Sequence, residues 1–177
     1  MARHDREMRW LLALFLLGAL DSCATNIKPP PDAAQPAKAK LGSYAVVMLK
    51  PLTTEANVQP NVSERIEAVL RECLAKVFPT MKPFESSPDK ALIIEPRIVD
   101  IKKVSIAERF FWGPLAGSSA GLLGVHFVDS ETKEIIADPI FYGRANAWGG
   151  AVTIGATDNH MLSRLPEEAC DYSRANY

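Results

Sequence analysis

The chain has 177 residues, of which 47% are hydrophobic and 23% charged, and its formal net charge is −1. This length predicts one folded domain, and this composition is that of an ordinary globular protein. The near-neutral charge balance gives no electrostatic case for binding nucleic acid, so we expect no nucleic-acid partner.

The first feature in the chain is a secretion signal. Three arginines precede an uncharged run over residues 10–20. This run is too short to cross a bilayer, because a spanning helix needs about 20 residues. A positive start, a short apolar middle and the small residue Ser22 before the cleavage point are typical of secretory signals. We therefore expect residues 1–22 to be a cleaved signal peptide.

The end of this signal resembles the lipobox of bacterial lipoproteins, in which a peptidase cuts before a diacylglyceryl-modified cysteine. Leu20, Ser22 and Cys23 carry the resemblance. It implies that Cys23 is lipidated. Ala24 after the cysteine, in place of an aspartate, implies the periplasmic face of the bacterial outer membrane. Asp21 departs from the motif and is expected to slow processing. An uncleaved anchor and an ordinary secreted protein with a free cysteine are the alternatives.

Residues 23–42 are predicted to be a tether that carries the lipidated cysteine. A regular helix or central strand is disfavoured there by four prolines, Pro29, Pro30, Pro31 and Pro36. A proline-rich segment is a semi-rigid spacer. We therefore expect a single globular periplasmic domain over residues 43–177, held away from the membrane.

The folded domain is predicted to begin with a strand within residues 43–52, which Pro51 ends. A helix is predicted over 59–79, because apolar residues recur there every three or four positions. Asn61 and Glu64 have the spacing of a capping box at the start of this helix.

A second strand is predicted over about 91–104, where Pro96 indicates an edge position or a bulge. Residues 121–128 and 134–142 are predicted to form a hairpin around the turn DSETKE. The C-terminal stretch 153–177 is predicted to be a helix that Pro166 kinks.

The element order is β-α-β-β-β-α. The simplest packing is a single mixed sheet of about four strands with both helices on one face, an α+β fold. About 135 residues are enough to bury a self-sufficient core.

Four stretches of the domain resemble a family of small bacterial lipoproteins known only as a domain of unknown function. They are YAVVMLKPL, ALIIEPRIVDI, RFFWGPLAG and VHFVDSETKEIIA with its D-x-x-T turn. The architecture is also similar to envelope lipoproteins of the curli-secretion type. Pro166 and Lys133, the latter where a turn glycine is usual, depart from the family pattern. The resemblance implies an envelope lipoprotein and brings no catalytic residue with it.

Phe110, Phe111 and Trp112 are adjacent in a predicted loop. They cannot all enter one core from an extended chain, so we expect at least one to be exposed, and exposed aromatics mark contact sites. The alternative is that they cover an open end of the sheet, and Trp148 has the same two interpretations. Our first hypothesis is an outer-membrane lipoprotein that binds another envelope protein, or is an accessory subunit of an envelope complex.

Residues 117–121 match G-x-S-x-G with Ser119 at the centre, the pattern of a hydrolase nucleophile. Asp129 or Asp158, followed by His160, would complete the order of a triad. A helix should follow such a serine, whereas the sequence after Ser119 is typical of a strand. We therefore expect the chain not to be an enzyme, and a small serine hydrolase stays as an alternative.

A second alternative is a glycine zipper that forms oligomers on membranes. Residues 110–128 are uncharged, and Gly113, Gly117 and Gly121 recur at every fourth position. Such spacing lets membrane helices pack closely. Pro114 within the stretch argues for a loop and a buried strand instead.

Cys73 and Cys170 fall on the two predicted helices and can pair in an oxidising compartment. A buried free thiol at Cys73 is the alternative. The chain contains no C-x-x-C, no H-E-x-x-H and no phosphate or dinucleotide fingerprint, so no metal and no cofactor is expected.

Overall fold

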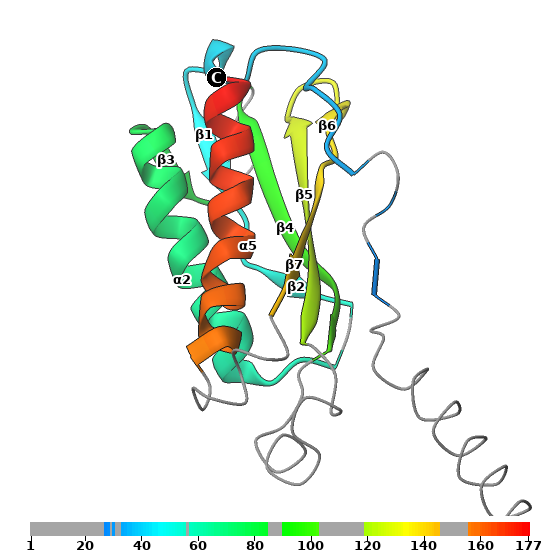
Figure 1. Cartoon of the computed structure of the whole chain (residues 1–177). Coiled ribbons are helices and arrows are strands. Elements are labelled where there is room, and N and C mark those ends of the chain that lie inside the picture. The colour runs from blue at the N-terminus through cyan, green and yellow to red at the C-terminus, as the bar shows by residue number, and fades with distance from the viewer. Residues whose placement is uncertain are drawn as a thin grey trace, which may run out of the picture.

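A computed structural model describes residues 27–28, 30, 33–55, 57–84, 90–102, 119–145 and 156–177, with the backbone alone at 156–159. Two helices lie side by side on one face of a mixed sheet (Figure 1). The expected α+β class, with both helices on one face, is confirmed.

The sheet has seven strands among the described residues. They are β1 (Val47–Leu49), β2 (Thr53–Thr54), β3 (Met81–Pro83), β4 (Leu92–Lys102), β5 (Ala120–Asp129), β6 (Ile135–Ala137) and β7 (Ile140–Arg144). The strand order is β3-β1-β4-β5-β6, with β2 also pairing with β4 and β7 also pairing with β5. β1 runs parallel to β3 and β4, and β2 runs parallel to β4, whereas β5 is antiparallel to all three of its partners.

The expectation of about four strands understates this sheet. The first predicted strand corresponds to β1, which ends before Pro51 as expected, whereas the two-residue strand β2 follows Pro51 and was not predicted. The second arm of the predicted hairpin is divided, since Pro139 lies between β6 and β7. β3 is only three residues long and ends in Pro83, so it has no alternating pattern to predict it from.

Pro96 lies in the middle of β4 and not at a sheet edge, and the bulge in this strand comes later, between Ile98 and Asp100. Pro96 is tolerated because it faces the gap between β1, whose pairing ends at Leu49, and β2, whose pairing starts at Thr53. The Pro96 carbonyl oxygen accepts a hydrogen bond from the Thr53 hydroxyl at 3.4 Å. A backbone N–H at this position, which proline lacks, would point to the same side of the strand.

The first helix, α2 (Pro60–Val77), begins one residue before the expected capping box. Gln59 is its N-cap and makes no side-chain capping bond, so the predicted box of Asn61 and Glu64 is wrong. Pro60 explains the difference, because proline is favoured at the first helical position, where its missing N–H has no partner to lose. Phe78 ends the helix, and its N–H donates to the Leu74 carbonyl at 2.8 Å.

The second helix, α5 (Ala156–Ala175), contains Pro166 and continues past it for nine residues. It packs directly on the backbone of β7. A Cβ atom at Gly143 would lie only 2.9 Å from Leu165 Cγ, so glycine is needed at this close approach.

The core lies between the two helices and the sheet. Its largest fully buried side chains come from both helices, three strands and the N-terminal side of the domain: Leu41, Val47, Leu49, Ile66, Leu70, Leu74, Leu92, Ile94, Ile98, Leu123, Phe127 and Leu165. This arrangement leaves the opposite face of the sheet without a helix among the described residues.

The predicted tether is in part a structured segment, which we call the strap (residues 33–42). It runs along the edge formed by β6 and β7 (Figure 1). The Lys38 N–H donates to the Ile136 carbonyl at 2.9 Å, and the Ile140 N–H donates to the Ala33 carbonyl. The strap therefore covers an edge that would otherwise present unpaired backbone groups.

The other side of the strap is bound to the end of α5. Asn176 accepts the Leu41 N–H at its carbonyl and the Ala37 N–H at its side chain. Leu41 itself is fully buried and begins a short 3₁₀ turn (Leu41–Ser43). The packed domain thus includes residues that we assigned to the tether, and its start moves from residue 43 to residue 33 at the latest.

Candidate functional site

The face of the sheet opposite the helices carries a group of charged side chains. Along β4 the buried Ile94 and Ile98 face the helices, so Glu95 and Arg97 point to the other face. Together with side chains from neighbouring strands and connections they form what we call the open-face cluster: Lys50, Glu55, Glu95, Arg97, His126 and Asp138.

Arg97 is the centre of this cluster, with a side chain only 20% exposed. Its Nη2 lies 3.3 Å from Asp138 Oδ1, and its Nε lies 3.4 Å from Glu55 Oε1. The guanidinium also contacts the imidazole of His126. One arginine therefore links β4 to the end of β2, to β5 and to the connection between β6 and β7.

His126 on β5 extends the network to both sides. Its Nε2 lies 3.0 Å from Asp138 Oδ1, and its Nδ1 lies 4.0 Å from Glu95 Oε2. Glu95 in turn pairs with Lys50 at 2.6 Å, and Lys50 Nζ lies 4.9 Å from the centre of the Phe84 ring. The charges form a connected network and not a set of isolated pairs.

Gly124 makes room for this arrangement. A Cβ atom there would lie 3.0 Å from Arg97 Nε and 3.3 Å from Arg97 Cγ. The arginine side chain can therefore lie across the backbone of β5 and reach Asp138 on its far side. Glycine in the middle of a strand often marks such a close approach.

The cluster is suited to recognition of a polar surface. It combines two permanent cations with three carboxylates, so it has no excess of positive charge. Partly buried apolar side chains, Leu122, Val128 and Tyr142, share the same face. Within the described part of the chain, no group of His, Cys, Asp and Glu has the arrangement of a metal site.

A second polar contact fixes the turn after β5. The Tyr44 hydroxyl donates to Asp129 Oδ2 at 2.9 Å, and burial, followed by this bond, raises the pKa of Tyr44 to about 12. Asp129 also accepts the backbone N–H groups of Thr132 and Glu131, at 3.0 and 2.8 Å. The bond from the Thr132 N–H lowers the pKa of Asp129 most, and the bond from the Tyr44 hydroxyl lowers it next.

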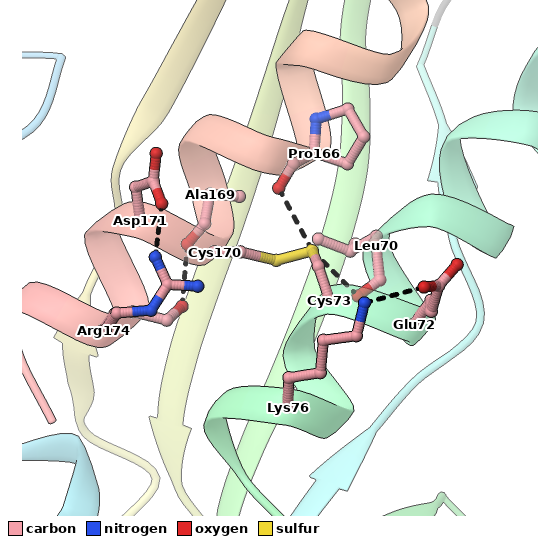
Figure 2. The surroundings of a disulfide bond; sticks show 10 residues. Leu70, Glu72, Cys73, Lys76, Pro166, Ala169, Cys170, Asp171 and Arg174 are labelled. Atoms are coloured by element: carbon pink, nitrogen blue, oxygen red, sulfur yellow. Dashed lines mark hydrogen bonds and ion pairs between the residues drawn. A yellow bond between two sulfur atoms is a disulfide. The ribbon is translucent and has the colours of Figure 1, made fainter.

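On the helix side, Cys73 and Cys170 are joined by a disulfide (Figure 2). The bond links α2 to α5, and the Cα atoms of the two cysteines are 6.0 Å apart. The two cysteines are separated by 97 positions in the sequence. Cys73 Sγ also lies 3.6 Å from the Pro166 carbonyl oxygen. Of the two interpretations that the sequence left open for these cysteines, the structure has the paired one.

Five of the predicted site residues lie outside the described residues: Cys23, Phe110, Phe111, Trp112 and Trp148. Lipidation and the aromatic contact loop therefore stay predictions.

Ser119 is fully buried, and the strand β5 begins at the next residue. A nucleophile elbow has a helix after its serine, so the backbone that follows Ser119 does not have that geometry.

The proposed glycine zipper is described only at Gly121, since Gly113 and Gly117 lie outside the described residues. Gly121 lies in β5, where an added Cβ would be 3.1 Å from Leu165 Cδ1, so its small size serves packing against α5. Across the part of the chain that the structure describes, no helix has the length and apolar character that crossing a membrane requires.

Sequence reasoning did not find the open-face cluster. The signal that could have found part of it is the spacing in IIEPRIV, where Glu95 and Arg97 are two residues apart in a strand and therefore share a face. Their partners Glu55 and Asp138 lie in connections far away in sequence, and only the fold brings them together.

No protein-family model matches the chain. No curated protein matches it either. Among solved structures it is similar to PelC from Paraburkholderia phytofirmans, described as a dodecamer, at TM-scores of 0.53 and 0.54 in two crystal forms. The identity is 7%, and the matches cover 85% and 80% of this chain and 95% and 93% of PelC.

Two further structures superpose more loosely. XCC0632 from Xanthomonas campestris, of the family DUF330, has a TM-score of 0.45 at 10% identity over 85% of this chain and 91% of that one. The lipoprotein GNA1162 from Neisseria meningitidis has a TM-score of 0.44 at 11% identity over 72% of this chain and 99% of that one. The likeness to PelC, at TM-scores above 0.5, establishes a shared fold.

Proposed function

We propose that this chain is a lipid-anchored envelope protein, attached through Cys23 to the periplasmic face of the outer membrane, whose folded domain binds another envelope protein. The role is binding and not catalysis. The open face of the sheet is the observation that carries the proposal, because it combines a fixed charged network with partly buried apolar side chains that still reach the surface.

The disulfide supports the compartment. Disulfides persist in oxidising compartments such as the bacterial periplasm and are rare in the cytosol. Cys170 is 2% exposed, so the bond lies inside the packing of α2 against α5. This agrees with the secretion signal that the sequence predicts over residues 1–22.

The geometry of the open-face cluster supports binding. Arg97 is held by Asp138, Glu55 and His126, so its position is fixed before a partner arrives. A side chain that is already ordered loses little conformational freedom when it binds. Charged groups of this kind give specificity for a surface of complementary charge.

The direct test is photo-crosslinking in intact cells that express the full chain. A crosslinking residue at Tyr142 or Val128 samples the open face, and one at the exposed Arg71 on α2 is the matched control. We expect an adduct of one defined mass from the open-face positions alone, and its loss in Arg97→Ala. An adduct that forms equally from Arg71, or that survives Arg97→Ala unchanged, contradicts the assignment to this face.

The anchor has a separate test. Mass spectrometry of the mature protein should show an acylated cysteine at position 23, and Cys23→Ala should leave the membrane fraction. A mature protein that still begins at Met1 contradicts the lipid anchor without bearing on the open face.

Self-assembly is a second candidate. PelC, whose fold this chain shares, is described as a dodecamer, and beyond Ile140, where the strap bonds, β5 is the only strand that β7 pairs with among the described residues. An adduct with twice the mass of the chain in the same crosslinking experiment would identify a second copy as the partner.

A further inference from the structure

The strap ties the start of the folded domain to one particular edge of the sheet. We infer that it holds the β6–β7 edge of the domain against the lipid surface of the membrane. The inference rests on the proposed lipid anchor at Cys23, and it replaces the expectation that a long tether holds the domain away from the membrane.

The strap is part of the domain and does not extend the reach of the anchor. The Tyr172 hydroxyl donates to the Gln35 carbonyl at 2.6 Å, and the Ala37 N–H donates to Asn176 Oδ1 at 3.0 Å. Leu41 is fully buried beneath these contacts. Releasing the strap would expose Leu41 and break bonds to both α5 and the sheet edge.

The chain that remains between anchor and strap is short. Ten residue steps separate Cys23 from Ala33, and at about 3.6 Å per step they span about 36 Å when fully extended. As a proline-rich spacer of about 3.1 Å per residue it reaches about 31 Å. Ile27 is 7% exposed and so is already packed; its four steps from Cys23 reach about 14 Å.

The attachment point decides which side of the domain faces the lipid. Ala33 is bonded to Ile140 at the β6–β7 edge, whereas β3 is the opposite edge of the sheet. Four strand spacings separate the two edges, which places β3 about 19 Å farther from the attachment point.

The surface at the near edge suits a lipid headgroup layer. A groove of about 280 Å³ lies between the strap and β6, lined in part by Lys38, Ile135 and Asp138. Ile135 is 43% exposed, one of the two large exposed apolar side chains of the described residues, and the exposed Lys38 beside it pairs with Glu134 at 3.0 Å. An apolar side chain next to a lysine can enter the interface while the ammonium group stays at the headgroups.

The test is a pair of distances measured on the lipidated full chain in phospholipid vesicles. A donor fluorophore is attached at Gln35→Cys on the strap or at Lys82→Cys on β3, both exposed positions, and the acceptor is on the lipid headgroups. We expect the strap label to lie closer to the membrane than the β3 label by roughly 19 Å. Equal distances, or a closer β3 label, overturn the inference.

A matched variant tests whether the length of the tether sets the orientation of the domain on the membrane. Twelve Gly and Ser residues inserted between Ala24 and Ile27 should remove most of the difference between the two labels, because the domain can then turn freely. If the difference persists, the tether does not set the orientation. If the protein does not float with vesicles, or floats equally well as Cys23→Ala, the lipid anchor itself fails, and that outcome is distinct from a floating protein with the wrong orientation.

Discussion

The two faces of the sheet are built from the same strands and differ in what they contact. On β4, Ile94 and Ile98 are buried against the helices, while Glu95 and Arg97, one position away, carry the open-face cluster. Gly143 brings α5 onto the sheet backbone on one face, and Gly124 brings Arg97 onto it on the other. The difference indicates that the helix face supplies stability and the open face supplies recognition, so neighbouring substitutions should separate the two properties.

The largest expected effect is on the helix face, at the disulfide. Cys73→Ala with Cys170→Ala should lower the free energy of unfolding by about 4 kcal/mol, because the bond restrains a long loop of the unfolded chain. Urea denaturation monitored by circular dichroism measures the change. Open-face crosslinking should be retained at temperatures where the double variant is folded.

Reduction provides the control for this prediction. Dithiothreitol should destabilise the wild-type chain by a similar amount and leave the double variant unchanged. If reduction has no effect on the wild-type unfolding curve, the disulfide does not hold α2 to α5 in solution.

The two glycines give a matched pair with the next largest effect. Gly143→Ala should cost about 1–3 kcal/mol of unfolding free energy, because the new methyl group meets Leu165 and Met161 in a packed core. Gly124→Ala should change it by less than about 1 kcal/mol, because the methyl group meets only the Arg97 side chain, which can leave its ion pairs and turn toward solvent without opening the core.

Binding should show the opposite order for this pair. Gly124→Ala displaces Arg97 from Asp138 and should reduce the yield of the open-face crosslink, whereas folded Gly143→Ala should keep it. If both variants lose stability and crosslinking in proportion, the faces do not have separate roles.

Much of the helix face could be predicted from the sequence, and the open face could not. Apolar periodicity located α2, α5 and β4, because burial against one partner imposes a repeat on neighbouring residues. The strap was missed because its one core residue, Leu41, follows a proline-rich stretch without a pattern. The open-face cluster depends on Glu55 and Asp138, which lie outside regular strands and which only the strand order brings to Arg97.

A smaller effect is expected at Tyr44, and it depends on pH. The folded domain lowers the pKa of Asp129, so this group contributes stability above its unfolded pKa, near 4, that is lost as the pH falls through the lower folded value. The pKa of Tyr44 is raised from 10.0 to about 12, so its contribution is present below pH 10 and is lost as the pH rises toward 12. Tyr44→Phe should cost about 1 kcal/mol at neutral pH.

The pH profile of unfolding tests this pair. Tyr44→Phe should flatten the alkaline loss of stability and weaken the acid loss. Asp129→Asn should remove the loss of stability at low pH that comes from protonation of Asp129, both in the wild-type chain and in Tyr44→Phe. An acid limb that is unchanged in both variants would show that the bond between them does not contribute.

The smallest expected effect is at Lys133, in the turn that joins β5 to β6. Its φ of 61° is positive, which is the only such value among the described non-glycine residues, and glycine adopts that conformation without strain. Lys133→Gly should therefore raise the unfolding free energy by about 0.5 kcal/mol, after the loss of the bond from Lys133 Nζ to the Ser130 carbonyl.

Glu131→Gly, at an ordinary backbone conformation in the same turn, should lower the unfolding free energy, since glycine there only adds freedom to the unfolded chain. This turn sets the register of β6 on β5. A slip of one residue would exchange the side chains that face the helices with those that face outward, so the conformation of the turn matters to both faces of the sheet. Thermal unfolding resolves the two signs. If Lys133→Gly destabilises the domain instead, the turn owes its shape to the lysine side chain and not to its backbone conformation.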